Sequence, residues 1–228
     1  MKLSQANIVM LSLESSGERK KHVDRHLRGE KGLDPLVIDG YDAKELSLNQ
    51  IQNTLIQKVG KAWFVAYQKR SSTIMSNKEK CRMCCFLGHM LCLETALEKY
   101  GDKPVVIMED DVSIKFDPSV EITIPTNCDL FFLGGFHKVA KDEDWEPVVG
   151  MNKVIPKLVK YWCAHAYLVM KPSKFLKALK DHRPCCYDSY LNRYMMSQAY
   201  FNYPSLVVQT PSLPSQIDGS CPFHHLSF

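Results

Sequence analysis

The sequence predicts an α/β fold in which a central, mainly parallel β-sheet is flanked by helices. Short apolar runs typical of strands alternate along the chain with stretches of helical periodicity. The 228 residues are 45% hydrophobic, which is enough to bury a full core. Because the chain contains no repeat, low-complexity tract or linker-like segment, we expect one domain over residues 1–228.

The first third of the chain is predicted to contain two strands joined by a helix. Residues 7–13 are an apolar run typical of a central strand, and the polar turn at 14–17 leads into a basic helix that opens near Glu18. Residues 35–40 form a second short apolar run, and residues 44–70 show only weak helical periodicity. This order of strand, helix and strand is the unit from which parallel sheets are built.

The alternation of helices and strands continues through the rest of the chain. Apolar side chains recur at helical spacing over residues 78–100, and Gly101 is expected to end that helix. The further predicted elements are a strand at 105–112 that ends in acids, a strand at 128–135 with a glycine exit, a long surface loop at 136–161, a strand at 164–170, and helices at 172–179 and 187–196.

The most informative segment is the run of three acids, Glu109, Asp110 and Asp111, at the end of a predicted buried strand; we call it the acid run. Neighbouring carboxylates repel one another unless a cation lies between them. Hard oxygen ligands suit Mg²⁺ or Mn²⁺, and a carboxylate-bound cation of this kind usually holds a substrate diphosphate. The alternative explanation is an acidic, solvated turn that follows a strand.

Composition and charge give poor support for a nucleic-acid-binding surface and none for a membrane span. The net charge is only +4, and the basic residues are scattered rather than gathered in a stripe. The first residues lack the apolar region of a signal peptide, and no apolar run approaches the roughly 18 residues of a membrane span. We therefore expect a cytoplasmic protein without a transmembrane segment.

The nine cysteines are an odd number, which favours reduced thiols in a cytosol-like compartment over a disulfide framework. Cys81, Cys85, His89 and Cys92 resemble zinc ligands at helical spacing. On one helix, however, Cys81 and Cys92 are separated by about 16 Å, too far for all four residues to bind one ion. Two of them together with ligands from elsewhere remain a possible metal site.

Several turn residues are predicted to lie beside the acid run at one edge of the sheet. Ligands of open α/β sheets bind at the carboxyl ends of the strands. Ser12 and Leu13 end the first predicted strand, Gly40 and Asp42 follow the second, and the glycines at 134–135 end a later one. Each of these signals is weak alone because turns contain Gly and Asp for conformational reasons.

Seven segments, taken together and in order, resemble glycosyltransferase family 25, which includes lipopolysaccharide-modifying and collagen galactosyl- or glucosyltransferases. The resemblance covers most of the chain, although each motif alone is unspecific. The segments are residues 8–13 with Arg19, 38–43, 85–89, 106–112, 129–135, 166–169 and 187–190.

This resemblance implies a GT-A-like nucleotide-sugar-binding fold, a UDP-hexose donor, a Mn²⁺ or Mg²⁺ cofactor, and inverting transfer to a glycan or glycoconjugate acceptor. By analogy with such sites, Asp111 is the principal metal ligand, while Glu109 and Asp110 divide further metal and donor contacts. A third metal ligand is expected near the C-terminus, where His224 and His225 are candidates.

The resemblance also assigns residues to donor binding and to catalysis. Arg19 is expected to neutralise the donor diphosphate, with an exposed basic helix as the alternative. His89 is expected beside the donor, although an interior histidine with satisfied hydrogen bonds is the commoner case. Asp188 is the expected base that takes the proton of the acceptor hydroxyl, although an aspartate near a helix start is also an ordinary cap.

The sequence departs from the family pattern in ways that leave other functions open. Gly88 stands where the family usually has serine, Cys84 where it has glycine, and Gln216 where it has aspartate. A non-catalytic sugar-nucleotide-binding or scaffold module with the same fold is one alternative, and a thiol-rich metal-binding protein is another. The acceptor, the choice between galactose and glucose, and the oligomeric state are not encoded in a recognisable motif.

Overall fold

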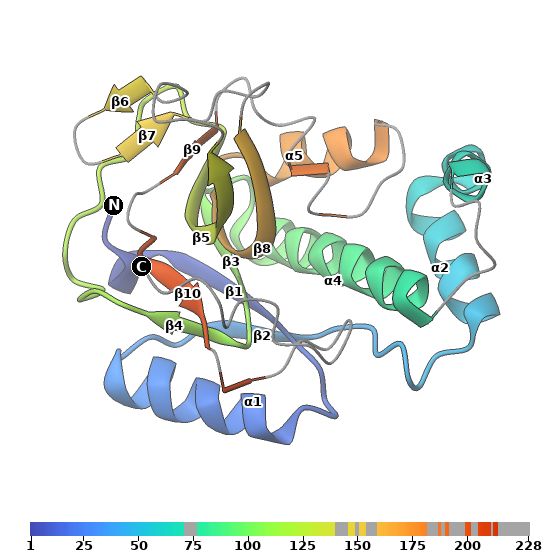
Figure 1. Ribbon diagram of the computed structural model, residues 1–228, viewed down its shortest axis with the longest axis horizontal. Helices are drawn as coiled ribbons and strands as arrows, with labels where there is room; N and C mark the ends of the chain where they lie inside the picture. Colours follow the sequence, from blue (N-terminus) through green and yellow to red (C-terminus); the bar gives the residue numbers. More distant parts are fainter. Residues whose placement is uncertain are drawn as a thin grey trace.

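The computed structural model describes most of the chain, and the sheet and its covering helices are seen in Figure 1. The described residues are 1–70, 77–139, 146–148, 151–153, 159–181, 187, 190–191, 199–201, 205–210 and 212–213.

The described strands form an eight-stranded sheet in the order β2-β1-β3-β8-β5-β9-β7-β6, and a separate pair formed by β10 and β4. In the large sheet β7 and β8 run opposite to the other strands. The predicted α/β class with a mainly parallel central sheet is therefore confirmed, with one antiparallel strand inserted between β3 and β5. The strands are β1 (Asn7–Ser12), β2 (Leu36–Asp39), β3 (Val105–Glu109), β4 (Val112–Ile114), β5 (Leu130–Val139), β6 (Glu146–Val148), β7 (Met151–Lys153), β8 (Val159–Val169), β9 (Ala199–Phe201) and β10 (Val207–Gln209).

Local chemistry sets some of the helix ends within the described residues. Ser47 and Gln50 form a capping box that starts α2, and Gly60, with φ of 89°, separates α2 from α3. Gly101, with φ of 65°, follows the last residue of α4 as predicted. The helices are η1 (Leu3–Gln5), α1 (Gly17–His22) with its π-helical continuation η2 (Val23–Glu30), α2 (Leu48–Val59), α3 (Lys61–Arg70), α4 (Asn77–Tyr100) and α5 (Pro172–Asp181).

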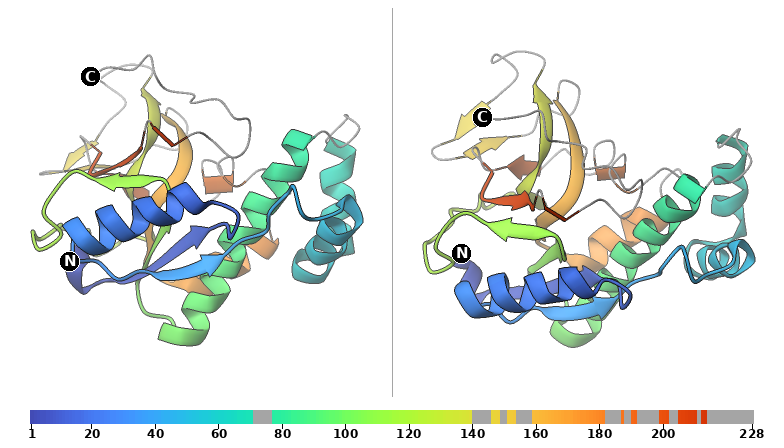
Figure 2. Two further views of the ribbon diagram at one scale, coloured as in Figure 1. Left: turned by 90° about the horizontal axis from the view of Figure 1, so that it is seen from below. Right: turned by 60° about the horizontal axis from the view of Figure 1, so that its bottom comes forward.

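Helices cover both faces of the sheet, with α1 on one face and α4 on the other, as Figures 1 and 2 show. Successive side chains of each strand point to opposite faces of the sheet, as the period of two requires. Val105 and Ile107 belong to the core beside α4. Val106 and Met108 belong to the core beside η2. The local sequence of β3 therefore builds two hydrophobic layers at once.

The side chain of Leu11, near the end of β1, lies against two glycines, Gly40 after β2 and Gly88 in α4. A Cβ atom on Gly40 would lie 2.7 Å from Leu11 Cδ1, and one on Gly88 would lie 2.9 Å from the same atom. The Leu11 side chain thus occupies the space between β2 and α4 that larger residues would need. Gly88, which stands where the family usually has serine, therefore lies where a side chain would press on Leu11.

Two predictions about the second half of the sheet are wrong. The stretch 136–161 is not a continuous loop, because β5 extends to Val139, β6 and β7 form a hairpin, and β8 begins at Val159. Nor does the strand end at the glycine pair, because β5 passes through Gly134 with irregular register on either side. Pairing with a neighbouring strand satisfies backbone hydrogen bonds whatever the side-chain period. The lack of a strand period over residues 136–161 therefore did not exclude strands there.

The predicted helix at 187–196 lies mostly outside the described residues, although Tyr187, Tyr190 and Leu191 are helical. Among the cysteines with described side chains, Cys81, Cys84, Cys92 and Cys128 carry thiols rather than disulfides. Within the described helices, none combines the length and the apolar character needed to cross a membrane.

Candidate functional site

The first three strands of the sheet end at one edge, where the predicted site residues meet. Ser12 of β1 is aligned with Asp39 of β2, and Leu11 of β1 is aligned with Glu109 of β3. The backbone N–H of Gly40 donates a 2.7 Å hydrogen bond to the Ser12 carbonyl oxygen. Parallel pairing therefore brings together turn residues that lie far apart in the sequence.

The acid run is divided between the two faces of the sheet. Glu109 continues the face of β3 that packs on α4, and its carboxylate lies 3.2 Å from His89 Nε2. Asp110 accepts a 2.8 Å hydrogen bond from the Ser12 hydroxyl and lies close to Arg19 of α1. The period of two that governs the strand thus persists past its end and separates these two carboxylates.

Arg19 is buried and forms ion pairs with two acids. Its Nη1 lies 2.6 Å from Asp110 Oδ1, and its Nη2 lies 3.0 Å from Asp111 Oδ2. The side chain is 9% exposed, so the exposed-helix alternative is wrong for this residue. Its single positive charge offsets part of the negative charge of the acid run from within the protein. Contact with a donor diphosphate remains a prediction.

Asp111 is a buried carboxylate with one oxygen that has no hydrogen-bond partner. Its Oδ2 accepts a 2.7 Å hydrogen bond from Gln209 Nε2 as well as the ion pair with Arg19. Its Oδ1 is buried and makes no hydrogen bond. Burial, followed by the charge of Glu109, raises the pKa of Asp111 to about 7. Gln209 was not predicted, because nothing local links it to a residue so distant in the sequence.

We expect Asp111→Asn to raise the free energy of unfolding by about 1–2 kcal/mol at pH 8 in metal-free buffer, because Arg19 keeps its ion pair with Asp110. An asparagine keeps an oxygen for Arg19 and Gln209 while removing a charge that burial disfavours. Asp111 has a pKa of about 7 in the folded protein, compared with about 3.9 in an unfolded chain. Its contribution to stability is therefore complete below about pH 4 and is lost as the pH rises through about 7.

Urea unfolding at several pH values between 5 and 8, with a chelator present, measures this effect. The gain from Asp111→Asn should grow with pH, whereas Asp34→Asn, at a side chain that is 91% exposed, should change stability little at any pH. A loss of stability for Asp111→Asn at pH 8 would contradict the assignment of Asp111 as a costly buried charge.

His89 has the contacts of a satisfied interior histidine. It is completely buried, its Nδ1 lies 2.9 Å from the Tyr167 hydroxyl, and its ring stacks on Tyr187 at 4.1 Å. Burial acts to raise the pKa of Glu109, but the hydrogen bond and charge of His89 outweigh it, so the pKa is lowered. Sequence patterns placed Tyr167 and Tyr187 in family segments but gave no sign that both contact His89.

The remaining predicted donor residues lie at the same edge or outside the described part. Leu13 accepts a backbone hydrogen bond from Ser16, and Asp42 accepts hydrogen bonds from the Ser15 hydroxyl and the Lys44 N–H. Their donor contacts stay predictions. The expected base and third metal ligands, and the departure Gln216, lie outside the described residues: Asp188, His224, His225 and Gln216.

The acid run offers hard oxygen ligands of the kind that Mn²⁺ and Mg²⁺ prefer. Both oxygens of Asp110 are engaged, by Ser12 and Arg19, which leaves Asp111 Oδ1 as the buried oxygen that lacks a partner. A buried carboxylate oxygen without a donor is better stabilised by a cation than by its present surroundings. The residues present therefore fit a divalent cation, with Asp111 as the ligand that the geometry favours.

Comparison with known protein families identifies a match for this chain. Residues 5–123 match the family model described as Glycosyltransferase family 25 (LPS biosynthesis protein). This segment is slightly more than half of the chain and contains both Arg19 and the acid run. A search of curated proteins found no match.

Proposed function

The chain belongs to glycosyltransferase family 25, and on this premise we propose that it transfers a hexose from a UDP-sugar to a glycan or glycoconjugate acceptor, with inversion and with a divalent cation. The observation that carries the proposal is the buried Asp111 carboxylate at the carboxyl edge of parallel strands, with Oδ1 lacking a partner. This edge is where open α/β sheets bind their ligands.

The cation would be held by Asp111, with Glu109 as the second carboxylate of the acid run. When bound, Mn²⁺ or Mg²⁺ supplies positive charge that stabilises the diphosphate as it leaves the sugar. Arg19 holds Asp110 and Asp111 in fixed positions through its two ion pairs. A pre-positioned carboxylate needs little reorganisation to bind, so Arg19 orients the site even though its charge is already paired.

The residues around the acid run would position the donor. Ser12 holds Asp110, and the Gly40 N–H holds the end of β1, so the backbone of both turns is fixed at this edge. We assign the contacts with the nucleotide to Ser12, Leu13, Gly40 and Asp42. Inversion requires a base on the face of the sugar opposite the diphosphate, and we assign Asp188 to that role. His224 and His225 remain candidates for the third metal ligand.

Binding of UDP with and without Mn²⁺ tests the proposal. We expect Mn²⁺ to strengthen UDP binding to the wild type, and Asp111→Asn to weaken it at least tenfold, which corresponds to about 1.4 kcal/mol. Calorimetric titration measures both effects. The matched control is Asp34→Asn, whose carboxylate is exposed and lies on the surface beside Arg28. Since Asp111→Asn is expected to be more stable than the wild type, unfolding would not explain a loss of binding.

UDP binding that is indifferent to Mn²⁺ and to Asp111→Asn would rule out the proposed metal site. Hydrolysis of UDP-galactose and UDP-glucose then separates a transferase from a binding module, because only the transferase releases UDP. Asp188→Asn should leave UDP affinity near the wild-type value while abolishing transfer to an acceptor, as expected for a base that acts only on the acceptor hydroxyl.

A further inference from the structure

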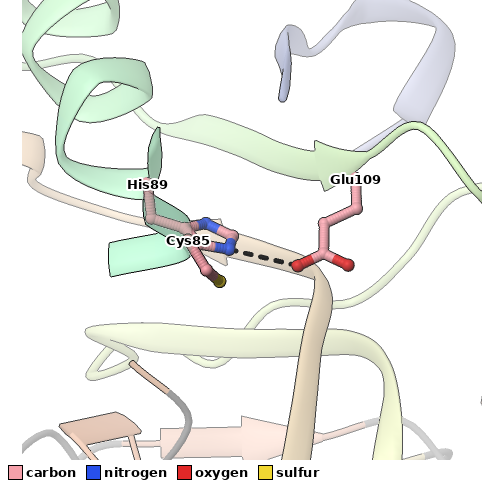
Figure 3. A group of neighbouring side chains, drawn as sticks. All are labelled: Cys85, His89 and Glu109. Atoms are coloured by element: carbon pink, nitrogen blue, oxygen red, sulfur yellow. Dashed lines mark hydrogen bonds and ion pairs between the residues drawn. The ribbon is translucent and has the colours of Figure 1, made fainter. Parts of the chain in front are cut away.

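Three side chains with different metal-binding atoms meet at the first residue of the acid run, Glu109. Cys85 and His89 lie one helical turn apart on α4, and Glu109 ends β3. One sulfur, one imidazole nitrogen and one carboxylate oxygen from these residues all lie within 4.8 Å of one another. In Figure 3 the imidazole of His89 points at the Glu109 carboxylate, and the Cys85 sulfur lies beside the imidazole.

The imidazole is held in the orientation that a metal ligand needs. The Tyr167 hydroxyl occupies Nδ1 at 2.9 Å, and Tyr187 packs against the ring with an interplanar angle of 4°. This arrangement directs Nε2 toward Glu109 Oε1, 3.2 Å away. Histidines that bind metals usually have their second ring nitrogen fixed by an oxygen in this way, which sets the tautomer. Tyr167 is therefore a positioning residue for His89.

The combination of ligand atoms selects the metal. Thiolate, imidazole and carboxylate together suit Zn²⁺ better than the hard cations that all-oxygen sites prefer. Ligand atoms around a tetrahedral zinc ion lie roughly 3.3–3.8 Å apart at the usual bond lengths. The three atoms, all within 4.8 Å of one another, thus need to approach by at most about 1.0–1.5 Å, which side-chain rotation can supply. Three protein ligands leave a fourth position for water or substrate, as in catalytic zinc sites.

We propose that Cys85, His89 and Glu109 bind a zinc ion, at a site that shares only Glu109 with the Mn²⁺ or Mg²⁺ site assigned to Asp111. On binding, the Cys85 thiol gives its proton to solvent and forms the metal–sulfur bond. His89 likewise gives up to solvent the Nε2 proton that faces Glu109, binds through the lone pair left on Nε2, and keeps the Nδ1 proton for Tyr167. The ion reaches the site from the side of Glu109, whose side chain is 25% exposed.

The two proposed sites share Glu109 but differ in their other ligands, so they are tested separately. Occupation by zinc would hold Glu109 against α4 and away from a cation at Asp111. Zinc binding does not depend on sugar transfer, because Cys85, His89 and Glu109 lie together without a sugar donor. Its experiment accordingly contains no nucleotide, and its outcome is independent of the UDP titrations.

Titration of the reduced, chelator-treated full chain with Co²⁺ is the direct test, because thiolate-bound cobalt has a near-ultraviolet charge-transfer absorption. We expect the wild type to develop this band at one equivalent and to lose it when Zn²⁺ is added. Cys85→Ser should abolish the band. Cys81→Ser is the matched control, since Cys81 is a half-buried thiol one turn earlier on α4 that is outside the ligand group. That variant should keep the band.

Two further variants separate a ligand from a residue that only maintains the fold. His89→Gln should weaken Co²⁺ binding at least tenfold, and Tyr167→Phe should weaken it about 10–100-fold, the usual effect of removing the partner of a metal-binding histidine. Absence of the band in the wild type, its persistence in Cys85→Ser, or its loss in Cys81→Ser would each overturn the proposal.

A measurement on the wild type alone covers the case in which a variant does not fold. Alkylation of the thiols, followed by peptide mapping, reports the reactivity of each cysteine with and without Zn²⁺. We expect Zn²⁺ to protect Cys85 at least tenfold relative to Cys81. Equal protection of both residues, or protection of neither, would contradict the assigned site.

Discussion

Replacing Arg19 with methionine is expected to lower the free energy of unfolding by about 3–5 kcal/mol at pH 8. Arg19 is the cation paired with both Asp110 and Asp111, and all three side chains are buried. Methionine retains much of the apolar stem but leaves two carboxylates without their ion pairs. A buried charge that loses its partner costs far more than a surface ion pair contributes.

The loss for Arg19→Met should become smaller as the pH falls. Without the guanidinium, the pKa of Asp111 rises further, so protonation of that carboxylate relieves more of the cost at pH 5 than at pH 8. Chemical unfolding at both pH values measures the difference. Lys20→Met, at the exposed neighbouring position, should stay within about 0.5 kcal/mol of the wild type. A comparable loss for both variants would show that helix charge, not the buried pairs, is responsible.

Gly134→Ala should destabilise the protein by about 3 kcal/mol or more, because backbone rather than a flexible side chain occupies the place of the new Cβ atom. A Cβ atom there would lie 1.9 Å from the Val207 carbonyl oxygen and 2.8 Å from His165 Nε2. Strand β5 and strand β10 would have to separate. The Leu206 N–H, which donates to the Leu133 carbonyl oxygen at 2.9 Å, would be displaced with them.

This separation would also reach the candidate site. Gln209 lies at the end of β10 and holds Asp111, so moving the strand removes a hydrogen bond from the acid run. We therefore expect Gly134→Ala to weaken Mn²⁺-dependent UDP binding as well as stability. Gly17→Ala is the control, since nothing lies within 4 Å of a Cβ atom at that position. Thermal and urea unfolding compare the two; a change within about 0.5 kcal/mol for Gly134→Ala would contradict the close approach.

Local patterns predicted the first half of the fold well, and the reason is visible in β1 and β3. Both strands are buried by helices on two faces, so they read as continuous apolar runs bounded by turns, and their ends were placed at one edge of a sheet. The second half of the fold was harder to predict from local patterns. Strand β5 continues beyond Gly134 by pairing with β8, and that pairing leaves no mark in the local side-chain period.

The candidate site was predicted in its location but not in its internal contacts. Ser12, Gly40 and the acid run were expected together and lie together. Arg19 was expected to face a diphosphate, yet its guanidinium contacts Asp110 and Asp111. A charged residue in a basic helix carries no local sign of whether it points at solvent or at a buried acid.

Local sequence was enough to predict the α/β class, the strand that carries the acid run, the end of α4 at Gly101, and the family segments, because each depends on residues near one another in the chain. Three-dimensional packing was needed to show that Glu109 faces His89 while Asp110 faces Arg19. The same holds for the contact of Gln209 with Asp111 and for the approach of Cys85 to Glu109 across two elements. These contacts follow from how strands and helices pack against one another. Packing joins positions far apart in sequence, and no local periodicity records it.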